Sequence, residues 1–273
     1  MILNFLLKIP DVVWAAVIAS LLTLGGVFLT NRGSYKRLLK QLEHEASQKD
    51  RNRNMEIRRQ VYLDAAEAIT ENHLILMKIS DLGISDSDLS KQFSKSESVI
   101  SKVYAIGSAK TVKTVSELTS AIGSKYLLLI AERIPLVRRK HEIEIQNELI
   151  IKASAERDQM IEIMKNVNLQ GIQNDRLMNV AERNFKFQQE QVSKLVEKRN
   201  QLMEINGKEQ IQLGMKCFLA SKEVSKFFAP AINSVREEMD IPFDEEAYRH
   251  TIEKSWEASE NSLKEFHDKL TKG

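Results

Sequence analysis

The feature that most constrains this chain is an uncharged, mostly apolar run from Val12 to Thr30. A helix rises about 1.5 Å per residue, so about 20 apolar residues are needed to cross the roughly 30 Å hydrocarbon core of a bilayer. Asp11 closes one end of the run, and Asn31 and Arg32 close the other. The sequence therefore predicts a transmembrane helix over 12–30, preceded by a short N-terminal segment, 1–11.

A cleaved signal peptide is the main alternative to an uncleaved anchor. It would have a basic start, a shorter apolar stretch and a small-residue cleavage site, whereas Lys8 is the only basic side chain before this run. Lys and Arg accumulate on the cytoplasmic flank of a span. We therefore expect an outward N-terminus, a cytoplasmic C-terminal domain and, for a bacterial protein, an inner-membrane location. The side chains that set this orientation are Arg32, Lys36, Arg37 and Lys40.

Small side chains recur inside the apolar run at helical spacing. At such spacing two helix backbones can approach closely, which favours self-association in a bilayer. Ordinary anchor composition is the alternative, because small residues are common in membrane helices. The residues of this predicted packing face are Ala15, Ala19, Thr23 and Gly26.

The composition of the remaining chain favours helices. Ten Gly and four Pro among 273 residues are few, whereas a sheet would need many turns. Residues 31–60 are charged and basic, which predicts a helical stalk. Apolar spacing resumes at Ile57, Val61 and Ala65, on one helical face. We therefore expect an all-α fold, with the N-terminal transmembrane helix followed over 61–273 by a bundle of long helices with coiled-coil-like segments.

Glycine and proline mark the expected helix ends. Helices are expected to end near Gly83, before Pro135 and at Asn206–Gly207, with a kink or break near Pro230. Asp244 is the expected cap of the last helix, because its carboxylate can accept hydrogen bonds from the free amides of a first turn.

The most regular apolar pattern lies between residues 178 and 202. Its positions alternate three and four apart, which is the seam spacing of a coiled coil. Gln188 and Arg199 interrupt the pattern, so packing inside a bundle and a free two-stranded coil remain alternatives. The predicted seam residues are Met178, Ala181, Phe185, Val192, Leu195 and Leu202.

Residue patterns that carry catalysis or ligand binding are weak in this sequence. Cys217 is the only cysteine, which excludes an intramolecular disulfide and a cysteine metal cluster. The five histidines form neither a His-Glu-x-x-His pair nor a close cluster. Residues 107–111 lack the Gly-Lys pair of a phosphate-binding loop. We predict no catalytic residue, no metal site and no cofactor.

The function that these patterns favour is non-enzymatic. A net charge of +2 provides no strongly basic face, so no nucleic-acid partner is expected. The leading hypothesis is a membrane-anchored helical interaction or scaffold protein, whose partners are the lipid bilayer and either a second copy or a cytoplasmic protein. The alternative is a membrane-tethered sensor or effector, for example in bacterial stress or phage defence, that changes its helix packing or perturbs the membrane. An unrecognised helical-bundle enzyme is a third hypothesis.

Overall fold

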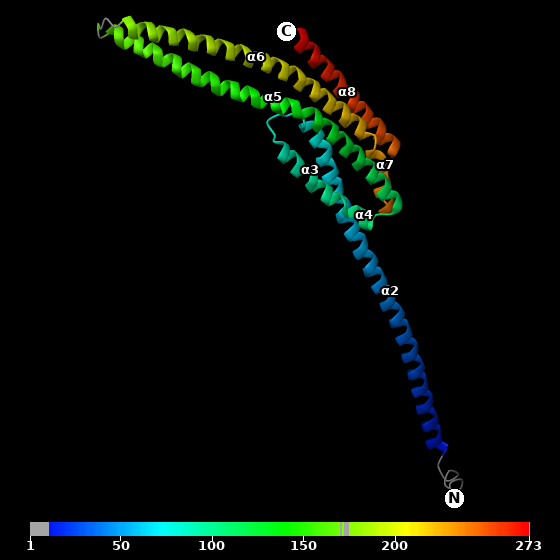
Figure 1. The fold of residues 1–273 in the computed structure, drawn as a ribbon. Helices are drawn as coiled ribbons and strands as arrows, with labels where there is room; N and C mark the ends of the chain where they lie inside the picture. The colour runs from blue at the N-terminus through cyan, green and yellow to red at the C-terminus, as the bar shows by residue number, and fades with distance from the viewer. Residues whose placement is uncertain (1–10, 170, 172–174, 273) are drawn as a thin grey trace. The chain divides into compact units, whose positions relative to one another are not determined.

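The computed structural model describes residues 11–169, 171 and 175–272, and every regular element in these ranges is an α-helix (Figure 1). The all-α prediction is therefore confirmed. The chain divides into two compact units, Met1–Gln60 and Val61–Gly273. Helix α2 (Asp11–Lys78) is the first described element, and the division falls within it.

The first unit contains, in its described part, only the N-terminal portion of α2. No side chain described there is buried. No helix in the described part of the chain is long and apolar enough to cross a membrane.

This finding corrects the interpretation of residues 12–30. The predicted transmembrane helix is not supported, and the predicted single-pass inner-membrane location is contradicted. The outward N-terminus and cytoplasmic C-terminal domain were consequences of that span and are withdrawn with it. The predicted segment 1–11 lies, apart from Asp11, outside the described residues.

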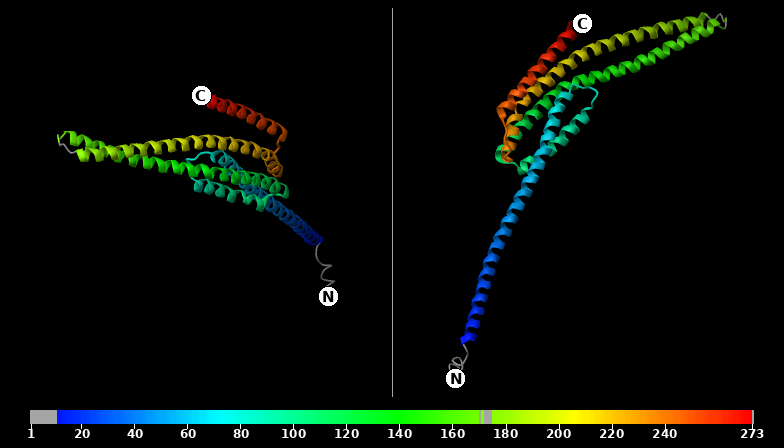
Figure 2. Two further views of the ribbon diagram at one scale, coloured as in Figure 1. Left: turned by 45° about the horizontal axis from the view of Figure 1, so that its top comes forward. Right: turned by 180° about the vertical axis from the view of Figure 1, so that it is seen from behind.

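The second unit begins with the end of α2 and continues through six more helices in the described chain. A long antiparallel hairpin of α5 and α6 is its largest feature, and α8 lies beside α6 (Figures 1 and 2). The helices that follow α2 are α3 (Asp86–Ile100), α4 (Lys102–Ile106), α5 (Ala109–Leu169), α6 (Asp175–Ser225), α7 (Phe228–Glu238) and α8 (Glu245–Lys272).

The apolar core of the second unit lies where α3, α4, α7 and the C-terminal end of α2 pack against the adjoining parts of α5 and α6. Leu76, Ile79, Leu89, Ile100 and Ile122 are completely buried there. Their removal from water is the main favourable contribution to folding.

Two predicted helix ends are wrong. Helix α5 continues through Pro135, which is exposed, so the carbonyl that loses its helical hydrogen bond can be hydrated. Helix α6 continues through Asn206 and Gly207. Asn206 is buried, and its side-chain oxygen accepts a hydrogen bond from Arg139 Nη1 at 3.3 Å. Tertiary packing therefore overrides the local turn preference at this site.

Other predicted helix ends agree with the structure. Helix α2 ends at Lys78, a few residues before Gly83, and the Asp81 carboxylate accepts a hydrogen bond from the Gly83 amide at 2.8 Å. The break near Pro230 falls between α6 and α7. Asp244 Oδ1 accepts a hydrogen bond from the Ala247 amide at 2.9 Å, which is the expected cap of α8.

Arg133 of α5 is the largest completely buried side chain among the described residues, at 1% exposure. Its Nη1 donates to the carbonyl oxygens of Ile79, at 2.5 Å, and Asp81, at 2.8 Å. Its Nη2 donates to the Ile84 carbonyl, and its Nε pairs with the Asp86 carboxylate at 2.7 Å. The guanidinium thus donates hydrogen bonds to the carbonyls of the turn between α2 and α3 and holds this turn against α5.

Replacement of Arg133 by methionine should strongly destabilise the second unit. The apolar side chain would leave three carbonyls and Asp86 without their charged donor, and loss of one partner of a buried ionic site costs about 3–5 kcal/mol. Chemical denaturation should show this decrease in the free energy of unfolding. The matched change Arg138→Met, at an exposed position of the same helix, should remain within about 0.5 kcal/mol. Equal effects of the two changes would contradict this role for Arg133.

Candidate interaction surfaces

The predicted seam of α6 forms one side of the α5–α6 hairpin. Ala181 is 1% exposed, and the other seam residues, Met178, Phe185, Val192, Leu195 and Leu202, are half-buried. Helix α5 presents a matching series at the same spacing. The buried and half-buried residues of that series are Leu136, Ile143, Gln146, Ile150, Ala153, Met160, Met164 and Val167. The spacing thus identifies a packing face within the chain, and contact of the seam with a second molecule stays a prediction.

Polar pairs at the edges of this seam fix how the two helices align. Gln188 Nε2 donates to Glu156 Oε2 at 2.6 Å, and Lys198 pairs with Glu142 at 3.0 Å. Nearer the core, Arg139 Nη1 donates to Glu209 Oε2 at 2.9 Å. A slip of one helix along the other would break all of these pairs together. These polar pairs therefore favour a single register of the two helices.

Gln146 of α5 is an exception among these polar residues. It is 6% exposed, and its side-chain oxygen lacks a hydrogen-bond partner among the residues that the structure describes. A buried unsatisfied acceptor costs about 1–3 kcal/mol.

The change Gln146→Leu should therefore raise the free energy of unfolding, by up to about 1–3 kcal/mol, because it removes an unsatisfied acceptor and keeps a similar volume. Chemical denaturation of the full chain measures the effect. Gln188→Leu is the matched control, since it removes a hydrogen bond that is made, and it should leave stability unchanged or lower. If Gln146→Leu lowered the free energy of unfolding and Gln188→Leu did not, the Gln146 oxygen would have a hydrogen-bond partner in the folded chain.

An aromatic cluster joins α8 to three other helices. Trp256 of α8 packs edge-on against Phe218 of α6, with ring centroids 5.1 Å apart, and against His73 of α2, at 6.4 Å. His73 also packs against Phe228 of α7, at 5.1 Å. Its Nε2 lies 3.0 Å from both the carbonyl and the hydroxyl oxygen of Ser221. Burial lowers the pKa of His73, and the hydrogen bond with the Ser221 carbonyl opposes that decrease.

This lowered pKa predicts a loss of stability in mild acid. The unfolded chain, with a histidine pKa of about 6.5, binds a proton more readily than the folded chain does. The neutral side chain of His73 therefore contributes its full stability above the pKa of the unfolded chain. This contribution is lost as the pH falls through that value towards the pKa of His73 in the folded chain. The free energy of unfolding should decrease between about pH 7.5 and 5.5. The decrease should be smaller in His73→Gln, and identical pH profiles would exclude His73 as the cause.

Polar contacts also hold α8 in place. Lys222 of α6 pairs with Glu260 at 2.5 Å, and Glu245 accepts a hydrogen bond from the Asn233 side chain of α7 at 3.0 Å. Hydrogen bonds from Lys222 and then Lys264 lower the pKa of Glu260 to about 2. No described side chain of α8 is buried.

Glu238 at the end of α7 caps the start of α5. Its Oε2 accepts hydrogen bonds from the Ser108 amide, at 3.0 Å, and the Thr111 hydroxyl, at 2.8 Å. Burial opposes ionisation of Glu238, but these donors, together with Tyr62, hold its pKa below the usual value. The group is therefore an anion fixed at a helix N-terminus, which stabilises the helix.

Large apolar side chains remain exposed on the outer face of α5. Leu127, Ile134, Ile145 and Leu149 are 41–69% exposed. Their spacings of seven, eleven and four residues place them on one side of the helix. We call these four residues the α5 stripe.

The predicted packing and orientation residues lie in the first unit. Ala19, Thr23 and Gly26 are exposed, and Ala15 lies outside the residues whose side chains are described. Arg32, Lys36, Arg37 and Lys40 are exposed on the same helix. Because their predicted role depended on the span, the structure assigns them no site.

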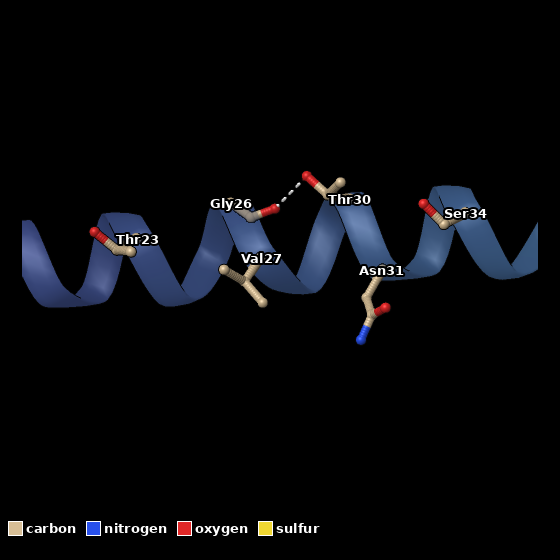
Figure 3. Close-up of a pocket in the computed structure, with 6 residues that line it drawn as sticks. All are labelled: Thr23, Gly26, Val27, Thr30, Asn31 and Ser34. Carbon is tan, nitrogen blue, oxygen red and sulfur yellow. Dashed lines mark hydrogen bonds between the residues drawn. The ribbon is translucent and has the colours of Figure 1, made fainter.

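A shallow depression on α2 includes part of this region. Thr23, Gly26 and Thr30 line one side of the helix, and the Thr30 hydroxyl donates to the Gly26 carbonyl at 2.8 Å (Figure 3). All of its lining residues come from this one helix. The depression is therefore open helix surface and does not enclose a ligand.

The groups that bear chemistry are dispersed. No set of three His, Cys, Asp or Glu side chains in the described part of the chain could hold a metal ion. Cys217 is buried, and burial raises the pKa of its thiol to about 11. Sequence reasoning missed Arg133 and the cluster around Trp256, although the spacing of Ile252 and Trp256 marks one face of α8. Comparison with protein-family models, with curated proteins and with solved structures finds no match to this chain.

Proposed function

We propose that this chain is a non-enzymatic helical interaction protein that binds a second copy of itself through the α5 stripe. The observation that carries the proposal is the exposure of Leu127, Ile134, Ile145 and Leu149 along one side of a 61-residue helix. Apolar side chains aligned on a helix favour burial against another helix of the same pattern.

The placement of the polar groups supports an interaction role. Arg133, Arg139 and Glu238 are each committed to contacts between helices. The Cys217 thiol is a poor nucleophile at neutral pH, because only the thiolate reacts and its pKa is raised. These groups stabilise the scaffold on which the α5 stripe is displayed.

A second candidate function is that of a sensor or effector that changes its helix packing. It is favoured by one observation, the attachment of α8 through half-buried side chains only. Elements with few buried apolar contacts open most readily. A signalling ligand that bound the surface covered by α8 would favour the conformation in which α8 is detached from it. Hydrogen exchange in the intact chain tests this function, because α8 should exchange faster than α6.

Two aspartates in the α5 stripe should abolish self-association. In the double variant Ile145→Asp, Leu149→Asp, a charged pair would have to be buried at the contact, which costs several kcal/mol. Light scattering of the full chain should give a multiple of the chain mass for the wild type and the monomer mass for this variant. Both positions are exposed, so circular dichroism should be unchanged.

The matched control is Ala155→Asp, Gln159→Asp, which places the same charges four residues apart at exposed positions beyond the stripe. It should assemble as the wild type does. A wild-type chain that is monomeric at every concentration would reject self-association. Assembly that survives the stripe substitutions would place the contact elsewhere.

A further inference from the structure

The first unit exposes an apolar stripe on α2. Its side chains are 42–63% exposed. They lie at positions i, i+3, i+4 and i+7, so all four share one face of the helix. No described side chain of this unit is buried, and the stripe is therefore left uncovered. We call these four residues the α2 stripe: Tyr35, Leu38, Leu39 and Leu42.

The charges beside the α2 stripe all have one sign. Arg32, Lys36 and Lys40 recur four residues apart, so they form a row along one edge of the stripe. Arg37 is exposed on the same helix, and the sequence has no acidic residue between Arg32 and Glu43. The segment 32–42 therefore carries four positive charges and no negative charge of its own.

This combination of an apolar face and basic side chains fits the surface of an anionic bilayer. A helix that lies along such a surface needs one apolar face, whereas a span needs about 20 consecutive apolar residues. Long Lys and Arg side chains can hold their charge at the headgroups while their methylene groups follow the apolar face. The Tyr35 ring suits the same boundary, because its body is apolar and its hydroxyl is polar.

A second copy of the chain fits this segment less well. Helices that pair through an apolar stripe place opposite charges along its edges. Pairing of two copies over the segment 32–42 would instead add four more positive charges and supply no acid to neutralise them. Negatively charged headgroups supply the missing charge.

We propose that the segment 32–42 of α2 binds the surface of an anionic lipid bilayer. The α2 stripe faces the acyl chains, and the basic row contacts the headgroups. The helix lies along the bilayer in this contact, which requires no span. The surface belongs to the first unit, so this inference does not depend on the self-association proposed for the α5 stripe.

Flotation of the full chain with lipid vesicles tests the charge requirement. The chain should bind vesicles of phosphatidylcholine that contain about one third phosphatidylglycerol, and it should not bind vesicles of phosphatidylcholine alone. Lys36→Gln with Lys40→Gln should weaken binding to the anionic vesicles by about 25-fold, because each basic side chain near the surface contributes about fivefold. The matched change Lys36→Arg with Lys40→Arg keeps both charges and should bind as the wild type does.

A leucine variant tests the apolar face in the same assay. Leu38→Ser with Leu42→Ser should weaken binding by at least about tenfold, because two apolar side chains can no longer enter the lipid. The control is Leu63→Ser with Leu74→Ser, which removes two similarly exposed leucines of the second unit and should leave binding unchanged. The self-association variant Ile145→Asp, Leu149→Asp should also bind as the wild type does.

Three results would overturn the proposal. The first is an absence of binding to the anionic vesicles. The second is equal binding to neutral and anionic vesicles that persists in the lysine and leucine variants, which would place the lipid contact outside this segment. The third is a leucine variant that binds vesicles normally but has a lower mass by light scattering without lipid, which would make a second copy the partner of the α2 stripe.

Discussion

The buried guanidinium of Arg133 is the interaction on which the packing of the second unit depends. A planar group with five donors can satisfy several carbonyls at once, and here it binds those of Ile79, Asp81 and Ile84. These carbonyls belong to the turn that follows α2, where the Asp81 carbonyl also accepts a hydrogen bond from the Ile84 amide at 3.3 Å. A turn buried without such a donor would be costly. The same contact holds α5 on the N-terminal side of Pro135, and buried Leu136 holds it on the other side. Helix α5 therefore passes through the proline.

The α5–α6 hairpin depends on a different balance. Away from the core most residues of its seam are only half-buried, so apolar burial provides less stability there than around Leu76 and Ile122. Polar pairs such as Gln188 with Glu156 contribute little net energy at exposed positions, but each is made in one register only. Polar contacts thus determine the register of α5 against α6, and apolar contacts provide most of the stability of their packing. Gln146 is an exception to this pattern of polar contacts, since its buried side-chain oxygen has no hydrogen-bond partner among the described residues.

Part of this structure follows from the sequence and part does not. The helical class, the seam from Met178 to Leu202 and the Asp244 cap depend on local spacing, which is visible in the chain. The ends expected at Pro135 and Asn206–Gly207 fail because distant partners, absent from any local window, decide them. Arg133 and Arg138 stand in the same basic stretch, and only the fold buries one and exposes the other. The interpretation of residues 12–30 as a span rested on the length, apolar character and flanks of an uncharged run, and the structure does not support it.

The charged and polar groups inside the second unit serve helix packing, so its exposed surfaces are the candidates for function. Buried Arg133 and half-buried Arg139 and Glu238 all take part in helix packing: Arg133 binds a turn, Arg139 binds α6, and Glu238 binds the start of α5. Large apolar residues, in contrast, stay exposed along α5, outside the buried core. Scattered exposed apolar residues need no explanation, but several aligned on one helical face leave a surface that another helix can bury. Helix α8 demonstrates that this unit accepts a helix through a single amphipathic stripe.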